Sequence, residues 1–293
     1  MKNLTIEQLA VVFTVSVLTT WSILKLGMRR RNRYVALISA VTDLYRKGDF
    51  EAALQATEGL NVQGKEANYL YYRGDTLREL GRLDEAEEVL KRAVAVSEQE
   101  QMEVHGRTIR DGVLRMKQLV RLFAFANQSL AGVYLLQGRY DDAIKALEVS
   151  LRERPNRGSA QRQLGEVYLR MGKTAEALEW CQRAVETERA GPIESRELHE
   201  MHLAEELATL AWAVAVARSD QSQVEKLVTE ADQLAAHKPV MFFGRVNLHV
   251  GFAYEALGNP QEAIRRLTAA ASSDTHGAAG RLATARLAQL QAA

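Results

Sequence analysis

The sequence has one cysteine, Cys181, and four prolines among its 293 residues. A single cysteine excludes an intramolecular disulfide, and it fits a reducing compartment. Scarce proline, together with abundant Ala, Leu, Glu and Arg, favours long uninterrupted helices. The alternating β-branched runs that strands need are nearly absent after the first 25 residues. The sequence therefore predicts an all-α fold.

The chain also has no large excess of charge of either sign. Its net charge is +1, so no global positive field is present to hold a phosphate backbone, and we expect no nucleic-acid partner. The charge is unevenly placed, because the first 33 residues carry +5 and the remainder therefore carries −4. A basic N-terminal segment precedes a mildly acidic body.

No catalytic or metal-binding constellation can be placed on the sequence. Gly172-Lys173-Thr174 lacks the strand and the first glycine that a phosphate-binding loop needs. His199, His202 and Glu206 could share one helix face, but no second His or Cys cluster supports a metal site. We predict no catalytic residue, metal, cofactor or small-molecule substrate, and we interpret Cys181 as a buried structural thiol.

The N-terminal region contains an uncharged run from Leu9 to Leu24. Continued to Met28, it would form a helix of about 30 Å, the thickness of a bilayer's hydrocarbon core. Lys25 lies near its end and can reach the headgroups. We therefore predict a transmembrane helix that contacts the lipid bilayer through residues 9–28, within an N-terminal anchor domain of residues 1–34.

The orientation of this anchor follows from four arginines just after it. Positive residues beside a span stay on the cytoplasmic side, so everything C-terminal to them is predicted to be cytoplasmic. Two alternatives are a cleaved signal peptide, which would need a small-residue cleavage site, and a buried core helix. The arginines are Arg29, Arg30, Arg31 and Arg33.

Five segments of the body share a pattern of a small residue, a bulky residue, a Gly, and an Ala five residues after the Gly. Successive glycines are 33, 57, 34 and 86 residues apart, which fits a unit of about 34 residues with insertions. The glycines are Gly48, Gly81, Gly138, Gly172 and Gly258. The bulky residues are Leu44, Leu77, Tyr134, Tyr168 and Tyr254.

Each part of this pattern has a physical role in a helical hairpin. Small residues allow two antiparallel helices to approach closely, and the bulky residue fills the groove between them. The Gly ends the first helix in a left-handed cap, and the polar residue after it is expected to help start the second helix. One hairpin cannot bury its apolar face alone, so the units must stack.

The pattern resembles the tetratricopeptide repeat (TPR), over residues 35–188 and 240–272, and it includes a proline, Pro155, where that family places one. The resemblance implies a TPR superhelical solenoid of about six helical hairpins over residues 35–293, behind the N-terminal transmembrane helix. Residues 200–234 are interpreted as a degenerate unit without the Gly, and residues 281–292 as a capping helix.

An insertion over residues 97–119 continues into an apolar stretch that ends near Phe125. We expect one long helix from about Arg107, with too many apolar residues for one narrow stripe. Its added turns either pack on the second unit, which we favour, or expose an apolar strip for a partner or the membrane.

In TPR proteins the first helix of each hairpin lines the concave groove, and ligands usually lie there. Carried over to this sequence, the resemblance implies a groove that binds proteins or peptides, and its arginines could hold an acidic segment. Some TPR proteins hold an acidic C-terminus with a carboxylate clamp of Lys and Asn. The first three units of this sequence have no Asn at the matching positions. The predicted groove residues are Tyr71, Asp75, Arg78, Gln128, Arg162, Glu166 and Arg170, beside Ile38, Thr42, Tyr45 and Leu135.

The organisation is similar to that of membrane-anchored bacterial TPR scaffolds such as lipopolysaccharide assembly protein B. That type ends in a rubredoxin-like metal domain that needs four cysteines, and this chain has one. We hypothesise an adaptor in the bacterial inner membrane that recruits proteins to it. A structural or assembly subunit of a membrane complex and a mitochondrial outer-membrane import receptor are the alternatives.

Overall fold

The computed structural model describes residues 32–61, 65–104, 109–193 and 195–292, together with Lys25 and Met28, which are helical. Most of the predicted transmembrane segment over residues 9–28, and Arg29, Arg30 and Arg31, lie outside the described residues. Every regular element in the described ranges is helical. The expectation of an all-α fold is therefore confirmed.

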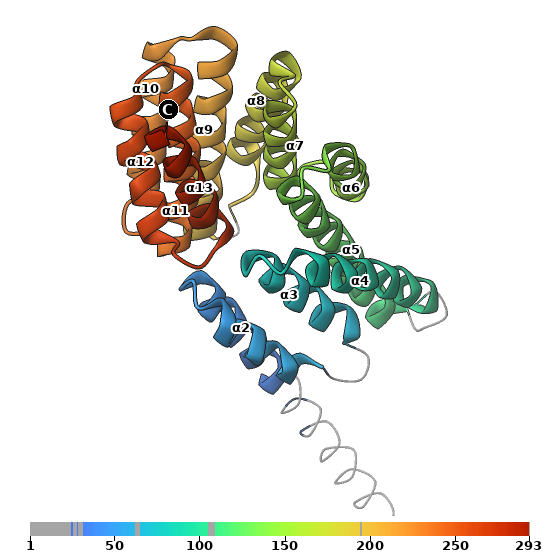
Figure 1. The fold of residues 1–293 in the computed structure, drawn as a ribbon. Coiled ribbons are helices and arrows are strands. Elements are labelled where there is room, and N and C mark those ends of the chain that lie inside the picture. The colour runs from blue at the N-terminus through green and yellow to red at the C-terminus, as the bar shows by residue number, and fades with distance from the viewer. Residues whose placement is uncertain are drawn as a thin grey trace, which may run out of the picture.

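The helices form six antiparallel hairpins that stack in chain order, followed by one last helix (Figure 1). The first hairpin consists of a helix over residues 32–46 and α2 (Phe50–Thr57), after which comes a short 3-10 helix, η1 (Glu58–Leu60). The other five are α3 (Glu66–Glu79) with α4 (Leu83–Val104), α5 (Ile109–Leu136) with α6 (Tyr140–Glu153), α7 (Gly158–Arg170) with α8 (Thr174–Ala190), α9 (Arg196–Arg218) with α10 (Gln221–Ala235), and α11 (Val240–Ala256) with α12 (Pro260–Ser273). The last helix is α13 (Ala278–Ala292).

The five repeat glycines end the first helices of their hairpins. Each has a φ between +72° and +77°, a left-handed conformation that glycine adopts without steric cost. The residue after each glycine donates its backbone N–H to the carbonyl of the bulky repeat residue, as Arg82 does to Leu77 at 3.0 Å. In the degenerate unit Ser219 takes the left-handed position, with φ +51°.

The expectation that the residue after the glycine caps the second helix is correct in only some units. Asp49 and Asn259 accept the N–H groups of Ala52 and Glu262, at 3.3 and 3.2 Å. The corresponding residues Arg82, Arg139 and Lys173 cannot do so, because their side chains have no acceptor. In those units the helix start relies on its backbone and on packing.

Small residues lie where two helices of a hairpin touch. A Cβ atom added to Gly74 would lie 2.5 Å from Leu90 Cγ, and one added to Gly165 would lie 2.4 Å from Cys181 Sγ. The five repeat alanines are completely buried against the first helices. Cys181 is buried as predicted, and burial raises the pKa of its thiol to about 12.

The insertion lengthens α4 and α5, which pack against each other as one long antiparallel pair. The long helix expected from about Arg107 begins at Ile109. In its described part the apolar side chains from Met116 to Phe125 are buried or half-buried, and Leu119 is fully buried. Internal packing is therefore the correct interpretation for these residues.

One described segment, Arg115–Leu136 within α5, is long and apolar enough to cross a membrane. Its most apolar window is 67% buried against other helices of the protein. That degree of burial is typical of a core helix.

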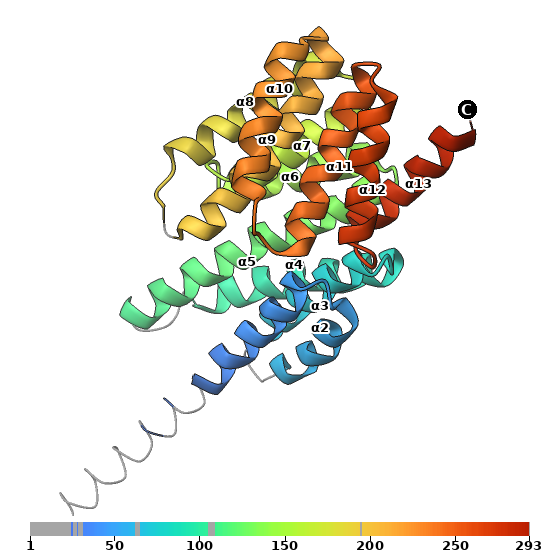
Figure 2. The same ribbon diagram turned by 90° about the vertical axis from the view of Figure 1, so that its left-hand side faces the viewer.

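The stack of hairpins curves until its two ends meet. In Figure 2, α11 and α13 lie directly above the first hairpin and α3. Arg245 of α11 pairs with Glu79 at the end of α3 at 2.6 Å, and Arg281 of α13 donates to the Glu79 carbonyl at 2.6 Å. The backbone N–H of Ala278 donates to the Glu79 carboxylate at 3.1 Å.

Candidate functional site: a cationic groove

The first helices of all six hairpins surround one cavity of about 370 Å³ on the inner face of the curve. The lining side chains come from the helix over residues 32–46 and from α3, α5, α7, α9 and α11. This placement follows from the repeat, because each hairpin presents the same face of its first helix to the inside. We call this cavity the central groove.

The central groove brings together most of the predicted groove residues. Tyr71, Asp75, Arg78, Gln128 and Arg162 all line it, as do Thr42 and Tyr45. Their role in binding stays a prediction. The prediction placed four other residues here that do not line the cavity: Ile38, Leu135, Glu166 and Arg170.

The wall of the central groove is strongly cationic. It contains six arginines and only two carboxylates, Asp75 and Glu205, so its formal charge is +4. Burial lowers the pKa of the neighbouring His202, which keeps that ring neutral at pH 7. The six arginines are Arg46, Arg78, Arg121, Arg157, Arg162 and Arg245.

Two of these arginines are committed to the closure of the solenoid. Arg78 lies 2.8 Å from the buried carboxylate of Glu79 and donates to Asp75, and Arg245 reaches the same Glu79 oxygen. Burial alone would raise the pKa of Glu79, but Arg78 and Arg245 lower it to about 2. Tyr45 also donates its hydroxyl to Glu79, at 3.0 Å.

Three other arginines, two of them groove-lining, surround one aromatic ring. The guanidinium carbons of Arg157, Arg121 and Arg154 lie 3.8, 5.1 and 5.6 Å from the centroid of Phe125. Tyr71 packs on the same ring at 5.9 Å. We call these residues the Phe125 cluster.

Glu166 belongs to an ion-pair network beneath the groove wall. Its carboxylate lies 3.4 Å from His249 and 3.5 Å from Arg162. Burial would raise the pKa of Glu166, but its interactions with His249, Arg170 and Arg162 hold that pKa well below its usual range. Arg162 also lies 3.4 Å from Glu205. Glu166 is 7% exposed and does not line the cavity, and its role in ligand binding stays a prediction.

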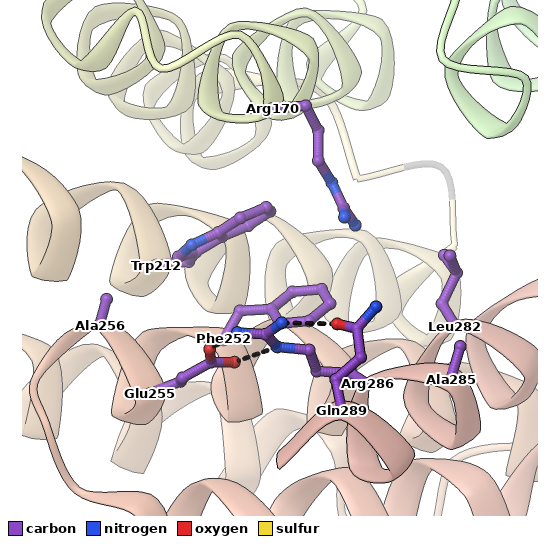
Figure 3. A pocket seen from close by; sticks show the side chains of 9 residues that line it. All are labelled: Arg170, Trp212, Phe252, Glu255, Ala256, Leu282, Ala285, Arg286 and Gln289. Carbon is purple, nitrogen blue, oxygen red and sulfur yellow. Dashed lines mark hydrogen bonds and ion pairs between the residues drawn. The ribbon is translucent and has the colours of Figure 1, made fainter. Parts of the chain in front are cut away.

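Arg170 lines a second pocket of about 370 Å³ between α7, α9, α11 and α13 (Figure 3). Its guanidinium lies 5.2 and 4.9 Å from the ring centroids of Trp212 and Phe252. On the opposite side Arg286 is held by Glu255 and by Gln289. This pocket combines an aromatic floor with paired charges, and it is separate from the central groove.

Sequence reasoning missed Arg121, Phe125, Arg157 and Arg245. The first two lie on the long helix of the insertion, and Arg157 precedes α7. Arg245 lies in the first turns of α11, six residues before Gly251, the small residue of the last unit. Residues at the same distance before the repeat glycine occupy equivalent positions on the first helices. Extending this register along α5 and α11 would have found Arg121, Phe125 and Arg245.

The described residues contain no group of His, Cys, Asp and Glu side chains that could hold a metal ion. His199, one of the three residues with metal-like spacing, instead lies 3.1 Å from the Glu188 carboxylate. Glu206 is buried without a hydrogen-bond partner for either oxygen.

Comparisons with known proteins agree with the repeat. The tetratricopeptide-repeat family matches residues 39–100 and 129–192. "Protein KINESIN LIGHT CHAIN-RELATED 3" of Arabidopsis thaliana is 25% identical over 274 residues, which cover 77% of this chain. The chain spans 41% of that relative's length.

The chain is also similar, at low sequence identity, to solved structures. BtubC (BKLC) from P. vanneervenii has a TM-score of 0.47 and 15% identity, and the match covers 82% of this chain and 91% of that one. A putative kinesin light chain with TPR-like repeats from Podosopora anserina has a TM-score of 0.44 and 18% identity, with coverages of 71% and 94%. The repeat glycines and the stacked hairpins agree with the family match, so the chain contains tetratricopeptide repeats over residues 39–100 and 129–192.

Proposed function

We propose that this protein is a membrane-anchored TPR scaffold that binds acidic segments of partner proteins in its central groove and holds them at the membrane. TPR proteins bind other proteins or peptides in general. The acidic partner and the membrane are the specific parts of this proposal.

The observation that carries the acidic partner is the charge of the groove wall. Of the six arginines in this cavity, Arg78, Arg162 and Arg245 pair with carboxylates of the protein, whereas Arg46, Arg121 and Arg157 form no ion pair within the described part of the chain. Guanidinium groups form bidentate hydrogen bonds with carboxylates, and such charge-assisted bonds are about twice as strong as neutral ones. An extended acidic segment in the groove would neutralise this excess charge.

The membrane part of the proposal is supported by the sequence. Residues 9–28 have the length and apolar character of a single span, and four arginines follow within five residues. The described solenoid begins at residue 32, so this anchor would hold the groove close to the bilayer surface. We assign the solenoid to the cytoplasmic side of a bacterial inner membrane.

An adaptor is favoured over a permanent structural subunit by the character of the inner face. A subunit fixed within a complex would present a large apolar surface, whereas the groove wall here is polar and charged. Within the described part of the chain, only eight large apolar side chains are exposed, and they are spread over the sequence from Met28 to Phe243.

The groove is tested with the full-length chain in nanodiscs and two labelled ten-residue peptides. One is rich in Asp and Glu, and the other has Asn and Gln at the same positions. We expect only the acidic peptide to bind, and Arg46→Glu or Arg121→Glu to weaken it by about tenfold, which corresponds to the loss of a charge-assisted hydrogen bond.

Arg152→Glu on the outer helix α6 is the matched control, because it makes the same charge change at an exposed position outside the groove. Equal binding of the two peptides would refute the acidic-partner proposal, and so would equal loss of affinity in the control variant.

The anchor is tested separately. The full-length chain should stay with bacterial membranes after alkaline extraction, and a chain without residues 1–28 should be released. A reporter fused after Ala293 should be active only on the cytoplasmic side. Release of the full-length chain, or an exported reporter, would refute the proposed topology.

A further inference from the structure

The Phe125 cluster concentrates positive charge more than any other part of the groove wall. Three guanidinium carbons, those of Arg121, Arg154 and Arg157, lie within 5.6 Å of one ring centroid. A cation over an aromatic face is favourable, but the ring carries no net charge and cannot neutralise Arg121 and Arg157.

Among the described residues, the two groove-lining arginines of this cluster, Arg121 and Arg157, have no carboxylate partner. Within the described part of the chain, neither Arg121 nor Arg157 forms an ion pair, and the Nε of Arg157 donates to the neutral amide of Gln128. The carboxylate that acts on Arg157 most strongly is Asp75, which already accepts from Arg78 at 3.0 Å and from Ser129 at 2.8 Å.

The pKa of Arg157 reflects this imbalance. Burial makes the largest contribution and lowers this pKa, and the neighbouring Arg154 and Arg121 lower it further. Tyr71 and Asp75 partly oppose these effects, and the resulting pKa of Arg157 is about 9. The guanidinium still carries its charge at pH 7. A bound anion would stabilise that charge.

Two further donors lie along the same wall. Helix α7 starts immediately after Arg157 with no acidic residue in its first turn and no side-chain cap, and the carboxyl of Glu206, which lies beside Gly158, forms no hydrogen bond among the described residues, so the first backbone N–H groups of α7 remain donors. Arg162, which lines the groove and is 7% exposed, has a buried Nε without a hydrogen-bond partner. A buried donor without an acceptor is costly, and a ligand oxygen would satisfy it.

We propose that the Phe125 cluster binds the phosphate of a phosphorylated side chain within the acidic segment, so that the scaffold reads the phosphorylation state of its partner. This inference rests on the proposed function of the groove. A phosphorylated residue carries a charge of about −1.5 to −2 and three acceptor oxygens, whereas a carboxylate offers one charge and two oxygens. The larger charge and oxygen count fit the two groove-lining arginines, Arg121 and Arg157.

The test uses three peptide libraries of ten residues with random flanks, which carry at the centre a phosphoserine, an unmodified serine, or two aspartates. Affinity for the full-length chain in nanodiscs is measured by fluorescence anisotropy. We expect the phosphoserine library to bind about tenfold more tightly than the other two, the gain of one to two charge-assisted hydrogen bonds.

Two substitutions locate the effect. Arg121→Gln changes an exposed side chain and should leave folding intact, and Arg157→Gln removes the central guanidinium. Each should abolish the preference for phosphoserine, whereas acidic peptides should still bind to the remaining groove arginines, with reduced affinity. Arg152→Gln on α6 is the matched control and should keep the preference.

The outcomes separate the two proposals. If the aspartate and phosphoserine libraries bind equally, the phosphate proposal is wrong and the acidic groove stands. If inorganic phosphate alone binds as tightly as the phosphoserine library, the cluster is a site for the free ion, which also overturns the proposal. If no library binds, the proposed function of the groove fails as well.

Discussion

At the scale of single residues, the most unusual group is Glu206 of α9. It is 1% exposed, and neither of its oxygens has a hydrogen-bond partner among the described residues. Burial and the nearby Glu188 raise its pKa to about 9, although Arg162 partly opposes them. The carboxyl group is therefore protonated in the folded protein at pH 7 and ionised in the unfolded chain.

We predict that Glu206→Gln increases stability in a pH-dependent way. Because the folded pKa is raised, the contribution of Glu206 to the free energy of unfolding is fully present below pH 4.5 and is lost as the pH rises towards 9. At pH 7 this loss is about 3 kcal/mol, and the variant should avoid it. Urea unfolding of both proteins at pH 4 and pH 7 measures the difference, and an identical pH dependence would contradict the prediction.

Two glycines of the repeat pattern, Gly165 and Gly138, are required for different physical reasons. Gly165→Ala places a methyl group 2.4 Å from Cys181 Sγ between α7 and α8, and we expect a loss of about 1–3 kcal/mol from overpacking. Gly138→Ala meets no atom within 4 Å but must adopt φ +74°, which costs about 1–2 kcal/mol.

A double variant distinguishes these causes in equilibrium unfolding. Adding Cys181→Ala should recover part of the loss in Gly165→Ala, because it removes the sulfur that the new methyl group meets. It should have no such effect on Gly138→Ala. Recovery in both would show that packing, and not the backbone, limits both positions.

At the scale of helices and hairpins, the degenerate fifth hairpin shows what the consensus glycine contributes. Ser219 ends α9 with φ +51°, a conformation that the other five hairpins give to glycine. Asp220 then caps α10 by accepting the N–H of Gln223 at 2.9 Å. The geometry of the repeat persists here without its sequence signal, because tertiary packing overrides the local preference.

We predict that Ser219→Gly stabilises the protein by about 0.5–1 kcal/mol, because it removes the strain of a left-handed serine. Ser222→Gly, in the first turn of α10, is the control and should destabilise by about 1 kcal/mol, since glycine is a poor helix former. Thermal unfolding should order the melting temperatures as Ser219→Gly, wild type and Ser222→Gly. The reverse order would contradict this account of the cap.

At the scale of the whole molecule, the closure at Glu79 defines the shape of the groove. Its carboxylate is fully buried and contacts Arg78 from its own hairpin and Arg245 and Ala278 from the last helices. These contacts join segments that are far apart in the sequence, so they limit how far the solenoid can open. The groove is consequently bounded on all sides by first helices.

We predict that Arg245→Ala and Arg281→Ala open the solenoid without unfolding its hairpins. Arg245→Ala should cost about 3–5 kcal/mol, because a buried carboxylate loses a partner. Small-angle X-ray scattering should show a larger radius of gyration, and hydrogen exchange in α13 should accelerate. Arg265→Ala on α12, an exposed arginine, is the control and should change neither measurement.

The closure should also depend on pH. The folded pKa of Glu79 is lowered to about 2, so its stabilising contribution is present above about pH 4.5 and is lost as the pH falls towards 2. Asp274 beside it has a pKa raised to about 6 by burial and by Glu79, and it acts in the opposite direction over pH 4–6. Scattering at pH 5 and pH 2 should therefore show expansion only at pH 2, where about half of Glu79 is protonated.

The sequence by itself determined the hairpins. A left-handed glycine, a bulky residue four positions before it and an alanine five positions after it are local requirements, and they repeat at a period that a helical pair fixes. Only the tertiary structure decided which arginines share the central groove. Small rotations between successive units add up to the curvature that brings Arg245 to Glu79 and divides Arg170 from Arg162, and no single repeat encodes that sum.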